Sequence, residues 1–423
     1  MKKVISSLLL SSFLLSSCGD NTKNINTDDN ISTFSKSDKT TNRGIFSIVE
    51  KNNSEYKKRN PELIRLKYQA MSESSFSFYR ATAYLYYMDL SKTSLNSSIN
   101  IPLQGDLHLD NIGTYFSSNG KVYYDMNDFD DSFTGSYTYD LARLLTSIYL
   151  AANEMNFSRS DAEDFSKEFF EHFQNYLKVF TKNKNLINEP FTNLTKYAQK
   201  AVDKTFSNSY QDFISEISSN GKFIYSDKIK KIPPEEFNNV NNAIKTYLNT
   251  NKNSNIGKVK DIAFYIAGKG SLGRYRYIIL FDGSTTKTND DLVLEIKEAT
   301  QPSSTINKTK LSGNQAQRVI QATKYFLSYT DNYYGITKIG NIDFYVRRVM
   351  PDEKVNLKKI DKNSEFKEHI KTIAAIIAKA QAKSGKGEQI LNDLDSKKDL
   401  ISDFAKSYSK QVMSDYEEFK SSF

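Results

Sequence analysis

Apolar residues recur at spacings of three and four along much of the chain, and this spacing predicts helices that bury one face. Seven stretches show it: residues 45–90, 139–155, 193–206, 234–248, 313–330, 366–385 and 403–419. Another helix is expected to begin at Ser160, because Ser160 and Glu163 have the spacing of an N-terminal capping box. The chain is therefore expected to be rich in helix.

Between residues 258 and 350 the pattern changes to the alternation that is typical of strands, with many Ile, Tyr and Phe residues. We expect a hairpin at residues 258–283, a third strand at residues 290–300 and a second hairpin at residues 335–350. A further strand is expected at residues 121–127, KVYYDMN. The predicted fold class is therefore α+β.

Three glycines in the first hairpin, Gly268, Gly270 and Gly273, form the pattern G-x-G-x-x-G. A helix follows these glycines in a dinucleotide-binding unit, whereas a second strand follows them here. We therefore expect a hairpin loop whose backbone amides can approach the phosphates of a nucleotide. Lys297 lies among apolar residues in the next strand, where it either faces water or binds those phosphates.

The chain has 423 residues, of which 38% are apolar, so it can bury the core of one large domain or of two lobes. The formal net charge is +8, but the lysines are spread along the sequence and there is no arginine-rich cluster. A nucleic-acid surface would need basic residues gathered on one face. Nucleic acid is therefore not an expected partner.

The N-terminus has the pattern of a bacterial lipoprotein. In residues 1–17, two lysines precede an apolar run that is too short to span a bilayer, as in a signal peptide. Cys18, the only cysteine, follows Leu-Ser-Ser, which predicts lipidation and an extracytoplasmic anchor at the cell envelope. The alternative is an ordinary signal peptide with an incidental cysteine. Residues 18–43 are polar and are expected to form a disordered tether.

Six aspartates occur among Phe and Tyr residues between residues 104 and 131: Asp106, Asp110, Asp125, Asp128, Asp130 and Asp131. In GDLHLDN, Asp106 precedes Asn111 by five residues, a spacing that is similar to that of the protein-kinase catalytic loop. In NDFDD, Asp128 precedes a phenylalanine, as the metal-binding aspartate of kinases does.

Arg80 lies in a separate apolar stretch, SSFSFYRATAYLYYMDL. A buried arginine needs an anionic partner, because unpaired burial of its charge is costly. That partner is either a carboxylate in a structural salt bridge or an anionic group in the site.

The chain resembles a bacterial family known as domain of unknown function 2252. The matching segments span most of residues 70–419 and include MSESSFSFYRA, GDLHLDNIG, NDFDDSFTGSYTYDLARLLTS, AGKGSLGRYRY, LEIKEA and DFYVRR. The first of the two acidic segments also resembles the GDLHxxN loop of aminoglycoside phosphotransferases and choline kinases. In those enzymes the glycine hairpin precedes the catalytic loop, whereas here it follows.

The resemblance implies a two-lobed, protein-kinase-like fold that is circularly permuted and has a helix-rich large lobe. Residues 44–255 would form the helical lobe with the catalytic and metal-binding loops, and residues 256–350 the β-rich nucleotide-binding lobe. Residues 351–423 would complete the helical lobe.

The resemblance also implies an ATP- and Mg²⁺-dependent phosphotransferase that acts on an unknown hydroxyl acceptor. Asp106 would take the acceptor proton, and His108 would orient its loop. Asn111, Asp128 and Asp130 would hold Mg²⁺. The phosphates would be bound by Gly268, Gly270, Gly273 and Lys297.

Two departures from the resembled families leave enzymatic activity open. Gln381 replaces a histidine, and no Asp or Glu between Thr300 and Thr330 is available to pair with Lys297. The alternative is a catalytically degenerate binding scaffold at the cell envelope. A metal-dependent phosphoesterase is a further alternative, because Asp106-Leu107-His108 has a D-x-H pattern. Such a site needs more histidines, and only His172 and His369 remain. Both are expected to be inert, and His369 is expected to face the polar side of its helix.

Overall fold

The computed structural model describes residues 42–207, 210–251, 256–268, 270–283, 290–306 and 308–423. The predicted signal peptide, Cys18 and nearly all of the predicted tether lie outside these residues. Within them, no helix has the length and apolar character needed to cross a membrane.

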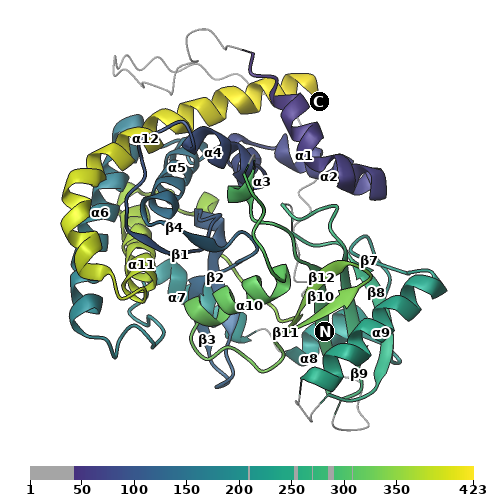
Figure 1. Ribbon diagram of the computed structural model, residues 1–423. Helices are drawn as coiled ribbons and strands as arrows, with labels where there is room; N and C mark the ends of the chain where they lie inside the picture. The colour runs from purple at the N-terminus through teal and green to yellow at the C-terminus, as the bar shows by residue number, and fades with distance from the viewer. Residues whose placement is uncertain (1–41, 208–209, 252–255, 269, 284–289, 307) are drawn as a thin grey trace, which may run out of the picture. The chain divides into compact units, whose positions relative to one another are not determined.

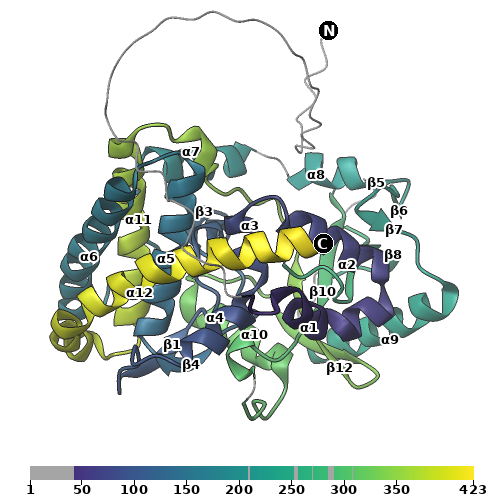
Figure 2. The same cartoon turned by 90° about the horizontal axis from the view of Figure 1, so that it is seen from above.

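One part of the structure is a bundle of helices, shown in Figures 1 and 2. Its helices are α1 (Ile45–Arg59), α2 (Pro61–Met71), α3 (Ser75–Ala81), α4 (Ala83–Leu90), α5 (Thr138–Glu154), α6 (Arg159–Lys182), α7 (Lys196–Ser207), α11 (Asn363–Ala382) and α12 (Gly387–Ser422). In Figure 1, α11 lies beside α6 and α12 runs along α5. The helical pattern predicted for residues 45–90 is thus divided among four helices, because Asn60 and Ser74 each cap a new one.

Two predicted helix starts are wrong. The capping box that begins α6 uses Ser158 and Asp161, two residues before the predicted Ser160 and Glu163. The last helix begins at Gly387, well before residue 403. Buried residues recur at helical spacing N-terminal to residue 403 as well, back to Ile390.

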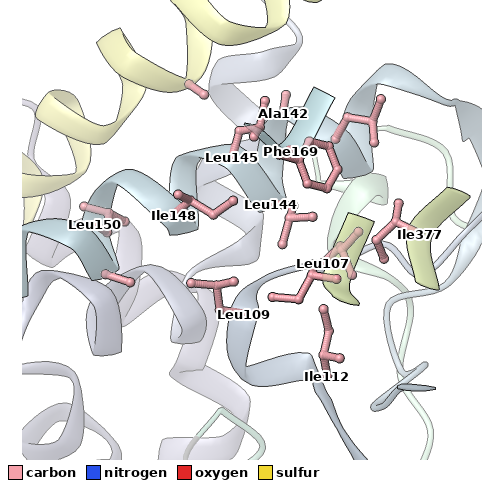
Figure 3. Packing of buried hydrophobic residues seen from close by; sticks show 14 of the residues in the cluster. Leu107, Leu109, Ile112, Ala142, Leu144, Leu145, Ile148, Leu150, Phe169 and Ile377 are labelled. Carbon is pink, nitrogen blue, oxygen red and sulfur yellow. The ribbon is translucent and has the colours of Figure 1, made fainter. Parts of the chain in front are cut away.

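The core of this bundle surrounds α5, which is buried on nearly all sides. Figure 3 shows Leu107 and Leu109 pointing into this core beside Leu144 of α5 and Ile377 of α11. These two leucines alternate with Asp106 and His108 in the sequence. Their burial anchors the acidic loop, because removing such side chains from water is favourable by about 1.5–3 kcal/mol each.

The other part is a six-stranded antiparallel sheet in the order β11-β12-β10-β9-β8-β7. Its strands are β7 (Ile229–Lys230), β8 (Val259–Tyr265), β9 (Arg276–Phe281), β10 (Leu292–Glu298), β11 (Gly335–Ile339) and β12 (Ile342–Arg348). The predicted hairpins are confirmed, since β8 pairs with β9 and β11 pairs with β12.

Alternate residues of the sheet face opposite sides. Ile279 and Phe281 of β9 pack in one cluster with α9 (Pro234–Thr250), whereas Ile278 and Leu280 pack in another with Ile214 of α8 (Tyr210–Ile217). The helix α10 (Gln315–Phe326) packs beside β12. Three two-stranded sheets complete the structure: β1 (Asn100–Leu103) with β4 (Phe133–Ser136), β2 (Ile112–Phe116) with β3 (Val122–Met126), and β5 (Ser218–Ser219) with β6 (Lys222–Phe223).

The mixed α+β class is therefore confirmed, with antiparallel sheets throughout the described strands. One side-chain prediction is wrong: His369 does not face the polar side of its helix. It is buried against the ring of Tyr124, and this burial lowers the pKa of His369 to about 4. His172 forms a partly exposed pair with Glu168 on the same helix.

Candidate functional site

Two cavities adjoin where the helices α1–α3 and the acidic loops meet the sheet. The larger one, the main cavity, has a volume of about 700 Å³, and the smaller one, the sheet-side cavity, about 320 Å³. Among the predicted residues, the main cavity is lined by Arg80, Asp106, His108, Asn111, Asp128, Asp130, Gly268 and Gly270. Lys297 lines the sheet-side cavity, and Asp128 and Gly268 line both. Segments that are far apart in sequence therefore form one site.

The acidic loop at residues 104–111 is fixed by hydrogen bonds to buried groups. The carboxylate of Asp140, in the first turn of α5, accepts hydrogen bonds from the backbone amides of Gln104 at 2.8 Å and Gly105 at 3.1 Å. Gly105 has a φ of +88°, and a Cβ there would overlap the backbone carbonyl of Asp131. Only glycine allows this close approach of the two acidic segments.

Asp106, which is partly buried, forms an ion pair with the fully buried Arg143 of α5. Arg143 Nε donates to Asp106 Oδ1 at 2.7 Å, and the guanidinium lies 4.1 Å from the centre of the Tyr79 ring. Burial raises the pKa of Asp106 to about 7, while Arg143 opposes this shift and the Asp131 and Asp128 carboxylates add to it. A carboxylate with this pKa can accept a proton near neutral pH.

The other predicted residues of this loop, His108 and Asn111, are buried. His108 Nε2 lies 3.7 Å from Asp106 Oδ2, too far for a hydrogen bond, and its Nδ1 has no hydrogen-bond partner among the described groups. Burial lowers the pKa of His108 well below its usual value, which keeps the ring neutral. Asn111 Nδ2 donates to the backbone carbonyl of Asp106 at 3.0 Å.

The second acidic segment, residues 127–131, is a turn in which Asp128 has a φ of +54°. This left-handed conformation is uncommon for residues other than glycine and is found most often where function requires it. Gln104 Nε2 donates to the carbonyls of Asn127 at 3.0 Å and Asp128 at 2.6 Å, which joins this turn to the first loop. The Asp128 side chain is 51% exposed.

Two residues of α10 also hold the turn. The ring of Phe129 stacks on Phe326 with 5.3 Å between the ring centres. Arg318 donates to the carbonyls of Asp130 at 2.8 Å and Ser132 at 2.6 Å. A carboxylate partner of Lys297 was expected in α10, which has no Asp or Glu. Instead, this helix contributes Arg318, which binds backbone carbonyls of the turn.

Lys297 is buried, not exposed to water, and its partner comes from the turn. Its Nζ lies 2.7 Å from Asp130 Oδ2 and 3.7 Å from Asp128 Oδ1. Asp130 also accepts hydrogen bonds from Arg274 at 2.8 Å and from the Tyr345 hydroxyl at 2.9 Å. Burial favours the neutral acid, but Lys297 and Arg274 outweigh this effect and lower the pKa of Asp130.

The remaining aspartates of the acidic segments have partners of their own. Asp110 pairs with Arg80 at 2.8 Å, and Asp125 pairs with Lys379 of α11 at 2.7 Å. Asp131 accepts a hydrogen bond from the backbone amide of Ser303. Arg80 is only partly buried, with 24% of its side chain exposed, and its partner is the Asp110 carboxylate. Among the described residues, no group of three or more His, Cys, Asp or Glu side chains is arranged to hold a metal ion.

The glycine loop between β8 and β9 extends over the helices α1–α3. A Cβ at Gly270 would contact the backbone carbonyl of Arg80, and one at Gly273 would overlap Tyr56 and Ile64. Gly268 and Gly270 therefore line the main cavity, whereas Gly273 lines neither cavity and allows close packing against α1 and α2.

Four residues that fix the site were not predicted: Gln104, Arg143, Arg274 and Arg318. Arg143 lies in an apolar helix, so the reasoning applied to Arg80 could also have identified it. Gln104 and Arg318 act mainly on backbone carbonyls, and such contacts have no pattern of residue types in the sequence.

Comparison with known proteins places the chain in a family. No curated protein and no solved structure matches it. A family profile described as an uncharacterized protein conserved in bacteria (DUF2252) matches residues 59–422, which include both acidic segments, the glycine loop and Lys297. The chain belongs to this bacterial family.

Proposed function

We propose that the protein is an ATP- and Mg²⁺-dependent phosphotransferase with a circularly permuted, kinase-like arrangement of its site. One observation carries this function: Lys297, on the strand after the glycine loop, lies 2.7 Å from Asp130 and 3.7 Å from Asp128. In kinases the corresponding lysine and aspartate act together on the nucleotide phosphates and their metal ion. The strand, the following helix α10 and the hairpin β11–β12 also occur in the order expected for such a lobe.

The donor set suits Mg²⁺. This ion prefers oxygen ligands, keeps several waters and is held by one or two carboxylates together with substrate phosphates. Asp128 offers a half-exposed carboxylate, and Asn111 lines the same cavity. When bound there, Mg²⁺ would neutralise charge on the phosphates. The Asp130 carboxylate is already occupied by Lys297, Arg274 and Tyr345, so we assign it mainly to positioning Lys297.

In this function Asp106 binds the acceptor hydroxyl in the main cavity and takes its proton. Its Oδ1 is held by Arg143, and no hydrogen-bond donor of the described chain contacts Oδ2. The nucleotide occupies the sheet-side cavity, which is lined by Lys297, Arg276 and Met350, among others. The two cavities adjoin at Asp128 and Gly268, where the γ-phosphate would lie.

The test is thermal unfolding of the purified protein with and without Mg²⁺ and ATP. A ligand that binds only the folded state raises the midpoint. We expect a rise that needs both components and is absent in Lys297→Ala. A second function, a binding scaffold without turnover, is favoured by the ion pairs that already satisfy Lys297. No shift with any nucleotide would select the scaffold.

We also propose that the protein is anchored at the cell envelope through acyl chains on Cys18. The sole cysteine after a short apolar run supports this location. In cells that express the chain, Cys18→Ala should move it from the membrane fraction to the soluble fraction. An unchanged distribution would contradict the anchor.

A further inference from the structure

Lys67 of α2 is a buried lysine without an ion pair. It is 7% exposed, and its Nζ donates to Asn53 Oδ1 at 2.9 Å. Asn53 is itself fixed, because its Nδ2 donates to the carbonyl of Val49 at 2.8 Å. No carboxylate in the described parts of the chain forms a salt bridge with Lys67. An ammonium group has three donors, so two of them have no acceptor among the described residues.

This arrangement is costly in the absence of a ligand. A buried charge without a counter-ion is strongly disfavoured, and proteins usually pair or neutralise it. Burial lowers the pKa of Lys67 to about 7; Arg274 adds to this shift, and the more distant Asp131 opposes it. A buried lysine with these surroundings gains its missing partner when an anion binds.

The side chain of Lys67 lines the main cavity, and so do further cations. Lys51, Lys308, Lys310 and Lys354 line it as well, and none of the four has an ion pair within the described ranges. Tyr84 lines the same wall, and its buried hydroxyl lies beside Asn53. In total seven Lys and Arg side chains and four aspartates line the cavity, and this excess of positive charge attracts anions.

The same cavity also contains Asp106, the proposed base. The Asp131 carboxylate influences the pKa of both Lys67 and Asp106, so both groups lie close enough to Asp131 to interact with its charge. A volume of about 700 Å³ is in the range that small molecules fill. One small molecule can therefore contact both groups.

We propose that the Lys67 end of the main cavity binds the anionic group, a phosphate or a carboxylate, of a small acceptor that also carries a hydroxyl group. This inference rests on the proposed phosphotransferase function and names the chemical class of its acceptor. Lys67 and the Tyr84 hydroxyl contact the anionic group, and the acceptor hydroxyl reaches Asp106.

The test is calorimetric titration of the purified full-length protein with sulfate, a tetrahedral dianion, and with acetate, a carboxylate. We expect at least one of them to bind, and the tighter of the two identifies the group. Lys67→Met should weaken this binding at least tenfold, and Lys67→Arg should largely retain it. Lys297→Ala, which removes the cation of the sheet-side cavity, should leave the affinity within about twofold of the wild type.

Thermal unfolding gives a second measurement that does not need a ligand. Lys67→Met removes a buried charge that has no counter-ion, so its unfolding midpoint should rise. Lys379→Met is the matched control, because Lys379 is equally buried but paired with Asp125, and its midpoint should fall. A fall in both variants would show that Lys67 is structural and would overturn the anion site.

The titrations separate this inference from the proposed function. Binding that is lost in Lys297→Ala and kept in Lys67→Met would overturn the site at Lys67, as would no binding of either anion. If sulfate binds at Lys67 but Mg²⁺ and ATP cause no shift, the anion site stands and the phosphotransferase function fails.

Discussion

The two acidic segments of the site, residues 104–111 and residues 127–131, present the same type of side chain in opposite surroundings. Asp106 in the first is 16% exposed, pairs with the fully buried Arg143 and has a raised pKa. Asp128 in the second is 51% exposed, and its nearest cation, Lys297, lies 3.7 Å away. From these surroundings we propose different chemistry for the two aspartates, proton transfer at Asp106 and ion binding at Asp128.

The largest expected effect is on turnover in Asp106→Asn. Removing a general base costs about 10²–10⁴ in rate. The measurement is the rate of phosphate release from ATP, with water as the acceptor. We expect this rate to fall within that range, while the affinity for the nucleotide stays the same.

The control for this variant is Asp125→Asn. Asp125 is also buried and paired with a cation, Lys379, but it lines neither cavity. The Asp125→Asn variant should have a lower free energy of unfolding and an unchanged turnover per folded molecule. Equal losses of turnover in the two variants would mean that Asp106 acts only through the fold.

The next effect is on nucleotide binding in Asp128→Asn. The exposed carboxylate contributes little to the fold, so the unfolding midpoint should change by less than about 2 °C. Affinity for ATP in the presence of Mg²⁺ should fall about a hundredfold, and affinity without Mg²⁺ should not change. Titration calorimetry with and without the metal measures both. Binding that keeps its dependence on Mg²⁺ would remove Asp128 from the metal site.

The pH dependence of turnover is a third way to compare the two segments. Asp106 must be deprotonated to accept a proton, and its pKa is raised to about 7. The rate should therefore fall about tenfold per pH unit below pH 7 and reach a plateau above it. The residual rate of Asp106→Asn should not show this slope. A wild-type rate that stays constant between pH 5 and 7 would contradict the raised pKa.

The smallest effect concerns the backbone of Asp128. Its φ of +54° is unfavourable for any residue with a Cβ, by about 1 kcal/mol. Asp128→Gly should therefore be more stable than Asp128→Ala by about this amount in urea unfolding. Equal stabilities would show that the turn carries no such strain.

Much of the fold could be predicted from periodicity, because long amphipathic helices and paired strands leave repeating patterns. The hairpin around Gly268 and the strand that carries Lys297 are examples. The first and last residues of the helices were less predictable. At the start of α6, two Ser–acid pairs have the spacing of a capping box, and the structure uses Ser158 with Asp161.

Most of the residues singled out in the sequence line the two cavities, but the sequence did not predict how they pair. The sequence identifies Asp106, Asp128 and Lys297, but it gives no sign that Asp130 is the partner of Lys297. Such a pair joins residues that are far apart in the chain and depends on how the sheet packs on the helical part. The burial of His369 against Tyr124 could not be predicted from the sequence for the same reason.

The most direct test of the central claim, that the two aspartates have different roles, is one titration of ATP with Mg²⁺ into three proteins. We predict that Asp106→Asn binds the nucleotide with the affinity of the wild type, whereas Asp128→Asn binds it about a hundredfold more weakly. Equal weakening in both variants, or wild-type affinity in both, would contradict the claim.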